Sequence, residues 1–459
     1  TSPPTFDLLL ETAKAATATL VVHPRLKTRG YREDGTDDRA RLEEARGLAA
    51  AISLDVRHAE SVTIAKPNPA TLLGEGTVER IAGLVKDLKI ELVVVDGHLS
   101  PGQQRSLEKA WNAKVIDRTG LILEIFGERA RTKEGRLQVE LAHLTYQRSR
   151  LVRSWTHLER QRGGFGFLGG PGETQIETDR RLIEERMRRI EQDLDKVKRT
   201  RALHRKTRRE VPYPVVALVG YTNAGKSTLF NRLTRAEVLA QDMLFATLDP
   251  TLRQIKLPHG ARILLSDTVG FISDLPTMLV SAFRATLEEV TLADVVLHVR
   301  DVSHEDWEAQ AKDVEAILDE LGLKGHAEGR ILEVWNKIDA LDAERLAALT
   351  QAARGIEPQR RPILVSALTG QGLDALLARI EEALAAGRVR FALDLDAADG
   401  AGLAWLHAHT EVLEREALPQ GGVHLVVRVD PERAAGLARR FPQAEVVNSS
   451  ARRRRRAAS

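Results

Sequence analysis

Cysteine is absent from the 459 residues of this chain. Its absence excludes disulfides, thiolate nucleophiles and cysteine-ligated zinc or iron–sulfur sites. The sequence also lacks any run approaching the roughly 20 apolar residues that a membrane-spanning helix requires. No apolar signal-peptide core opens the chain. We therefore expect a cytoplasmic protein.

An excess of charge of one sign is also missing. The chain has 68 Lys and Arg residues against 65 Asp and Glu residues, for a formal net charge of +3 and a pI of about 9.0. Any attraction to nucleic acid must therefore come from local basic patches. The 43% of hydrophobic and 29% of charged residues are the balance of a globular protein. The length suggests about three domains.

Short apolar segments alternate with amphipathic ones over the first part of the chain. Strands are expected at residues 19–22, 61–64, 92–95 and 114–116, and helices at residues 38–52, 77–88 and 101–111. This alternation is typical of βαβ units, which form a parallel sheet. We predict an N-terminal parallel α/β domain over residues 1–135.

The next segment, residues 136–210, has apolar residues at spacings of three, four and seven. They are Leu137, Leu141, Leu144 and Leu151, and then Ile183, Met187, Ile190, Leu194 and Val197. Such spacing predicts a long hairpin of two antiparallel helices. A glycine-rich loop, residues 163–172, would join them, with the second helix starting after Glu173-Thr174. A plain structural linker is the alternative interpretation.

Strands and helices alternate again over residues 211–388, where we predict a third domain of α/β type. A last segment, residues 389–450, has the pattern strand, helix, strand, helix, strand and predicts a small α+β domain. The tail, residues 451–459, contains five consecutive arginines. It is too uniformly charged to pack and is predicted to be disordered.

The sharpest motif is GxxxxGK[ST], which lies between an apolar strand and a helical segment. It consists of Gly220, Tyr221, Thr222, Asn223, Ala224, Gly225, Lys226 and Ser227, followed by Thr228. In this context the loop N–H groups surround phosphate oxygens at a helix N-terminus. Lys226 would bridge the β- and γ-phosphates, and the Ser227 hydroxyl would ligate Mg²⁺. Residues 211–388 are therefore predicted to form a P-loop, Rossmann-like nucleotide domain.

Two later segments indicate which base is bound. Asn336-Lys337-Ile338-Asp339 follows an apolar strand and resembles the NKxD element of GTPases. A carboxylate at Asp339 accepts hydrogen bonds from the guanine N1–H and amino group, which adenine cannot supply. Asn336 and Lys337 would shape the pocket. The tripeptide Ser366-Ala367-Leu368 resembles the SAK-type element that backs the base. We therefore predict a GTP hydrolase.

The segment Asp267-Thr268-Val269-Gly270 lies between these motifs, at the end of a strand. Asp267 matches the acidic residue that holds Mg²⁺ through water, and the Gly270 N–H can meet the γ-phosphate. The threonine of the first switch is Thr247 or Thr251, and we prefer Thr247. The predicted catalytic residues are Lys226, Thr247 and Gly270.

Phe271 stands where many Ras-type GTPases have a glutamine that orients water. Phenylalanine neither donates nor accepts a hydrogen bond, so backbone groups, a cation or a partner surface must orient the water. Slow basal turnover with stimulation by a partner is the resulting hypothesis. Asn223 resembles an asparagine that coordinates K⁺ beside the β/γ bridge in some GTPases. The alternative is that Asn223 only fixes the geometry of the loop.

Motifs outside the nucleotide elements are more specific. The block Gly169-Gly170-Pro171-Gly172-Glu173-Thr174, continued by Gln175-Ile176-Glu177-Thr178-Asp179-Arg180-Arg181, is similar to the signature of the HflX family of translational GTPases. Residues 99–104, 117–126, 138–142 and 242–251 resemble the same family. The resemblance covers about residues 15–390.

This resemblance implies a GTPase that binds the large ribosomal subunit and splits stalled or idle ribosomes in its GTP state, with hydrolysis driving release. It also implies that the glycine-rich loop reaches toward the peptidyl transferase centre. Glycines allow close approach to RNA, phenylalanines stack on bases and arginines pair with phosphates. The predicted RNA-binding residues are Gly163, Gly164, Phe165, Gly166, Phe167, Gly169, Gly170, Arg180 and Arg181. A solvated helix face is the favoured interpretation for most single arginines of the hairpin. The further candidates are Arg148, Arg150, Arg153, Arg160, Arg162, Arg186, Arg188 and Arg189.

The alternative function is a GTPase that assists assembly of the large subunit or modifies RNA, with the same fold and base-reading residues. The N-terminal domain contains no P-loop motif, so an rRNA contact surface is favoured there over a second nucleotide site. We expect a monomer without a membrane span, which uses Mg²⁺, with K⁺ as a further candidate cofactor. The expected partners are GTP, GDP and the large ribosomal subunit with its rRNA.

Overall fold

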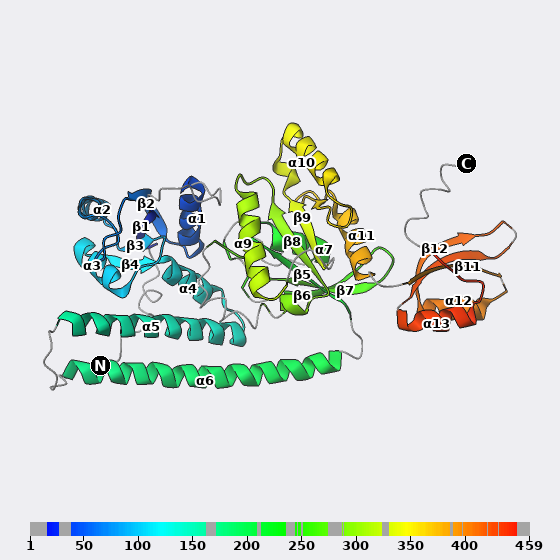
Figure 1. Ribbon diagram of the computed structural model, residues 1–459, viewed down its shortest axis with the longest axis horizontal. Coiled ribbons are helices and arrows are strands. Elements are labelled where there is room, and N and C mark those ends of the chain that lie inside the picture. The colour runs from blue at the N-terminus through cyan, green and yellow to red at the C-terminus, as the bar shows by residue number, and fades with distance from the viewer. Residues whose placement is uncertain are drawn as a thin grey trace.

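The structure is a computed structural model in which three sheets and a long helical hairpin are arranged along the chain (Figure 1). It describes residues 16–26, 38–161, 171–208, 213–235, 244–245, 247–248, 251–273, 287, 289–323, 330–385, 389–396, 398–419, 421–429 and 431–447. The predicted RNA-binding positions from Gly163 to Gly170 lie outside these ranges. The tail of residues 451–459 also lies outside them.

The N-terminal sheet is parallel, as predicted, with the order β2-β1-β3-β4. Its strands are β1 (Ala18–Leu26), β2 (Asp55–Ile64), β3 (Leu92–Val95) and β4 (Lys114–Asp117), and its helices are α1 (Asp38–Ala51), α2 (Glu75–Asp87), α3 (Pro101–Trp111) and α4 (Arg118–Arg129). Alternate residues of a strand face opposite sides of the sheet. Leu20 therefore packs with the apolar residues of α2 and α3, while Val21 packs with those of α1 and α4.

The helices α5 (Lys133–Gln161) and α6 (Pro171–Arg208) lie side by side below the N-terminal domain in Figure 1, and the longer α6 continues below the central domain. Met187, Ile190 and Leu194 of α6 are buried, as their heptad spacing indicates. The α6 helix begins at Pro171 rather than after Thr174, and proline is well suited to a first helical position. No helix in the described part of the chain is both long and apolar enough to cross a membrane.

The central sheet has six strands in the order β10-β9-β8-β5-β7-β6, and β6 is antiparallel to β7. Its strands are β5 (Val215–Gly220), β6 (Thr251–Lys256), β7 (Arg262–Asp267), β8 (Val295–Asp301), β9 (Ile331–Asn336) and β10 (Ile363–Leu364). Its helices are α7 (Lys226–Thr234), α9 (Trp307–Glu320), α10 (Ala343–Gly355) and α11 (Leu373–Leu384), with the 3₁₀ turn η3 (Ile338–Ala340). Residues of α7 and α11 pack on one face of the sheet and residues of α9 on the other. Burial on both faces explains the continuous apolar runs in β5 and β8.

The C-terminal domain is α+β, as predicted, but it has one strand more than the predicted pattern. Its elements are β11 (Val389–Leu395), α12 (Gly400–His409), β12 (Glu411–Ala417), β13 (Val423–Val429), α13 (Pro431–Arg440) and β14 (Glu445–Val446). The strands β12 and β13, which follow one another in the sequence between α12 and α13, form an antiparallel pair. β12 is an edge strand with charged, exposed residues, so its hydrophobic pattern is weak.

An apolar core joins the N-terminal domain to the central domain. The rings of Phe126 in α4 and Phe245 meet edge to face, with their centroids 4.8 Å apart. Tyr221, Phe271 and Ile272 belong to the same buried cluster. The N-terminal domain therefore packs directly against the segments that surround the phosphate loop.

Candidate nucleotide-binding site

The phosphate loop connects the end of β5 to the start of α7. Gly225 has a φ of +88°, and a Cβ atom there would lie 2.3 Å from Asn336 Nδ2, so this position requires glycine. Lys226 is 6% exposed, and its Nζ donates to the backbone oxygens of Gly220 (3.1 Å) and Tyr221 (2.7 Å). Burial lowers the pKa of Lys226 to about 8, against the opposing effect of Asp267. An ammonium group and a helix N-terminus thus meet at one end of the sheet, which suits phosphate groups.

Three oxygen-bearing side chains converge beside Lys226. Ser227 Oγ lies 2.8 Å from Asp267 Oδ2, Thr247 Oγ1 lies 2.9 Å from the same oxygen, and the two hydroxyl oxygens are 3.0 Å apart. Asp267 Oδ1 is buried and has no hydrogen-bond partner among the described residues. Two hydroxyls and a carboxylate with an unpartnered oxygen form a donor set that fits Mg²⁺. Thr251, the other candidate for the first switch, begins β6.

The second switch, which begins at Asp267 and is described as far as Ser273, packs directly on the phosphate loop. Thr222 N donates to Phe271 O (2.7 Å), and Phe271 N donates to Gly220 O (3.1 Å). A Cβ atom at Gly270 would lie 2.9 Å from Thr222 Cγ2 and 3.0 Å from Thr222 Cα and Lys226 Nζ, so a side chain here would press on the phosphate loop. The Phe271 ring is 1% exposed within the apolar core. It therefore cannot position water.

Asn336 connects the phosphate loop to the loop after β10, two segments of the predicted guanine pocket. Its Nδ2 donates to Ala224 O (2.9 Å), and its Oδ1 accepts from Ala367 N (3.0 Å). Lys337 has a φ of +64°, and its ammonium group lies 2.7 Å from Asp301 Oδ2. The carboxylate-bearing residue Asp339 is exposed in the turn η3.

The loop after β10 lies beside Asn336, to which Ala367 N donates. Ser366 is buried, and its Oγ accepts a hydrogen bond from Thr369 N (3.0 Å). Leu368 is 69% exposed. The structure therefore brings Asn336, Ala367 and the phosphate loop together, and it leaves Asp339 and Leu368 open to solvent beside them.

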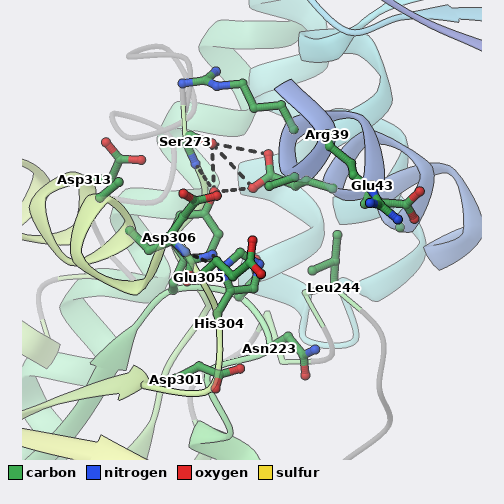
Figure 2. A pocket seen from close by; sticks show the side chains of 18 of the residues that line it. Arg39, Glu43, Asn223, Leu244, Ser273, Asp301, His304, Glu305, Asp306 and Asp313 are labelled. Atoms are coloured by element: carbon green, nitrogen blue, oxygen red, sulfur yellow. Dashed lines mark hydrogen bonds between the residues drawn. The ribbon is translucent and has the colours of Figure 1, made fainter. Parts of the chain in front are cut away.

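A cavity of about 740 Å³ lies beside the phosphate loop, between the central domain and α1. Figure 2 shows Asn223 and Asp301 at one end and Arg39 and Glu43 of α1 at the other. Asn223 is exposed and has a φ of +58°. Tyr221, Thr222 and Asn223 of the phosphate loop thus border a cavity that is shared with α1 of the N-terminal domain.

Sequence reasoning missed a set of residues that link this site to the N-terminal domain. Arg118 Nη2 donates to Glu44 Oε1 (2.5 Å) and to Ser273 O (2.9 Å), and the Tyr221 hydroxyl bonds to both Glu44 and Ser273 Oγ. Arg118 lies within one of the segments that resemble a known family, but no local spacing indicates its partners. The contact becomes visible only in three dimensions.

The arginines proposed for RNA contact differ in their surroundings. Arg180 and Arg181 are exposed on α6, and Arg180 Nε lies 3.3 Å from Glu184 Oε1. Arg186 Nε instead donates to Glu140 of α5 (2.6 Å). Arg150 Nη2 donates to the buried Asp117 (2.6 Å), so Arg150 takes part in packing the hairpin on the N-terminal domain.

A phosphate loop between β5 and α7 on a six-stranded sheet, with an NKxD-type segment at the end of β9, is the arrangement of a P-loop GTPase. Family descriptions match along the chain in the same order. They are GTP-binding GTPase N-terminal (residues 39–127), GTP-binding GTPase Middle Region (residues 129–208), 50S ribosome-binding GTPase (residues 215–337) and HflX C-terminal domain (residues 349–450).

Curated relatives agree with these matches. The chain is 53% identical to GTPase HflX of Magnetococcus marinus over 81% of this chain and 84% of that protein. It is 43% identical to GTPase HflX of Escherichia coli over 84% of this chain and 89% of that protein. A crystal structure of SsGBP with GDP aligns over 80% of this chain and 98% of that chain, at 24% identity and a TM-score of 0.46. The chain belongs to the HflX family of GTPases and is a GTP hydrolase, which confirms both predictions.

Proposed function

We propose that this GTPase binds the large ribosomal subunit in the cytoplasm and, in its GTP state, splits stalled or idle ribosomes, with hydrolysis driving release. The observation that carries the proposal is the combination of a guanine-type nucleotide site with a long hairpin packed on the adjoining domain. The matched description of residues 215–337 as a 50S ribosome-binding GTPase supports the choice of target.

The residues around Lys226 have distinct proposed tasks. The Lys226 ammonium group binds the β- and γ-phosphates, and the Gly270 N–H binds the γ-phosphate. Ser227, Thr247 and, through water, Asp267 would hold Mg²⁺. When bound, Mg²⁺ would neutralise charge on the β- and γ-phosphates. Asp339 reads the guanine base, in a pocket that Asn336, Lys337 and residues 366–368 shape.

Hydrolysis by the isolated protein is expected to be slow because the buried Phe271 cannot orient the attacking water. Stimulation would then come from the ribosome surface. Asn223 is the candidate ligand for K⁺; it is exposed and lines the cavity beside the phosphate loop. Equal hydrolysis rates in K⁺ and Na⁺ would instead leave Asn223 with a role in loop geometry.

The hairpin is the proposed RNA-binding element. Phe165 and Phe167 would stack on unpaired bases, while Arg180 and Arg181 would contact phosphates. Replacing both phenylalanines by alanine should weaken binding to the large subunit. The matched control is Leu182→Ala, at an exposed position of α6.

Sedimentation of intact ribosomes with the protein and a non-hydrolysable GTP analogue tests the proposal. We expect free subunits, with the protein on the large one, and we expect intact ribosomes when GDP replaces the analogue. Ribosomes that stay intact in both nucleotides would contradict splitting. Binding to immature large subunits alone would favour the assembly function.

A further inference from the structure

Arg118 crosses from the N-terminal domain to the second switch. It is the first residue of α4 and is 7% exposed. Its Nη1 donates to Asp96 Oδ1 (2.5 Å), and its Nη2 donates to Glu44 Oε1 (2.5 Å) and to the backbone oxygen of Ser273 (2.9 Å). His23 Nδ1 lies 2.8 Å from the other oxygen of Asp96. The guanidinium group is thus fixed by two carboxylates while it holds the switch backbone.

Tyr221 makes the matching contact from the phosphate loop. Its hydroxyl donates to Glu44, lies 2.7 Å from Ser273 Oγ, and accepts from Ser273 N (2.9 Å). Burial, together with the negative charge of Glu44, raises the pKa of Tyr221 well above its usual value, so the hydroxyl keeps its proton. Glu44 therefore binds a switch residue, a phosphate-loop residue and Arg118 at once.

The N-terminal domain also packs against the first switch. Phe126 of α4 meets Phe245 edge to face, and a Cβ atom at Gly47 of α1 would lie 3.1 Å from Leu244 Cδ1. In this arrangement Thr247 is within hydrogen-bond distance of Ser227 and Asp267. Both switches are therefore held around the phosphate loop by α1 and α4.

We infer that Arg118 and Glu44 are positioning residues for GTP hydrolysis, acting from the N-terminal domain on the second switch. They hold Ser273, and this contact keeps Gly270 packed on the phosphate loop beside Lys226. The buried Phe271 supplies no water-orienting group. Whatever orients the water, hydrolysis then also depends on the placement of backbone groups such as the Gly270 N–H. Small displacements of such groups cost large factors in rate. The inference concerns hydrolysis itself and does not depend on the ribosomal target.

The test uses the full chain and four variants, Arg118→Gln, Arg118→Lys, Glu44→Gln and Tyr221→Phe. In each we expect single-turnover hydrolysis at saturating GTP to slow by about 10- to 100-fold, with a smaller loss for Arg118→Lys because lysine keeps the charge. The KM for GTP and the affinity for GDP should change by less than about threefold, since uniform binding is retained. The double variant Glu44→Gln/Tyr221→Phe should be no slower than the worse single variant, because both substitutions break one cluster.

The control is Arg80→Gln, which breaks an exposed ion pair with Glu60 within the N-terminal domain. It should leave the hydrolysis rate unchanged. Normal hydrolysis in Glu44→Gln and Tyr221→Phe would overturn the inference. The inference would also be overturned if the hydrolysis rate fell only in proportion to losses of GDP affinity and thermal stability. Should Arg118→Gln fail to fold, Tyr221→Phe decides the matter, because it removes one hydroxyl and leaves the buried charges paired.

Discussion

At the scale of single residues, Asp339 is the proposed reader of the base. Its carboxylate would accept from the N1–H and amino group of guanine. Xanthine has an oxygen in place of that amino group, and an amide can donate to it. We expect Asp339→Asn to lower GTP affinity by about 100-fold or more and to create affinity for xanthosine triphosphate. Titration calorimetry with both nucleotides measures this, and Asp319→Asn, at an exposed position of α9, is the control. Unchanged GTP affinity in Asp339→Asn would contradict the role of Asp339 in reading guanine.

The buried Lys226 predicts how nucleotide binding depends on pH. Burial lowers its pKa to about 8 in the free protein. Phosphate groups favour the charged ammonium and raise this pKa, so binding takes up a proton above about pH 8. Affinity for GTP should therefore be constant near pH 7 and fall by up to about tenfold per unit well above pH 8. Calorimetry in buffers of different ionisation enthalpy measures the uptake, and its absence at pH 9 would contradict the shift.

Residues close together in a motif could be predicted from the sequence, whereas contacts between distant segments could not. The phosphate loop, Asp267 and Asn336 each lie in a short pattern whose spacing itself indicates the chemistry. Arg118 is separated from Glu44 by 74 positions and from Ser273 by 155 positions. The sequence does not distinguish a buried arginine from an exposed one, so the role of Arg118 becomes clear only from the packing around it.

At the scale of elements, prediction succeeded where local signals were strong. The bounds of α3 were predicted at both ends, and the structure shows why, since Ser100 and Gln103 form a capping box and Pro101 occupies the first turn. The helix α4 was not predicted. Its Leu121, Ile122 and Leu123 are all buried, so no polar face marks the helical period.

The packing of the hairpin gives a stability prediction. Ile190 of α6 is 1% exposed, within the heptad pattern. Ile190→Ala should lower the free energy of unfolding by about 2–4 kcal/mol through lost burial and the cavity left behind. Chemical denaturation measures the change. Leu182→Ala, at a position 53% exposed on the same helix, should change it by less than about 0.5 kcal/mol. Equal effects of the two substitutions would show that the seam of α6 is not packed.

At the scale of the whole molecule, the hairpin and the second switch meet at neighbouring residues. Asp117 is fully buried and accepts from the Tyr146 hydroxyl (2.6 Å) and from Arg150 Nη2 (2.6 Å), both on α5. The next residue, Arg118, donates to Ser273 of the switch. We therefore expect a shift of the switch to alter the point where the hairpin is anchored, which the following experiment tests.

This connection predicts that hairpin and phosphate-loop substitutions interact. Tyr146→Phe removes a hydrogen bond on the hairpin side, and Tyr221→Phe removes one on the nucleotide side. The affinity for large ribosomal subunits is measured with a GTP analogue and with GDP for both single variants and the double variant. We expect the analogue-over-GDP preference to be non-additive by about 0.5–2 kcal/mol. If the two sites act independently, the free-energy effects of the two substitutions will add. Additive effects would contradict a connection between nucleotide state and the hairpin through Asp117 and Arg118.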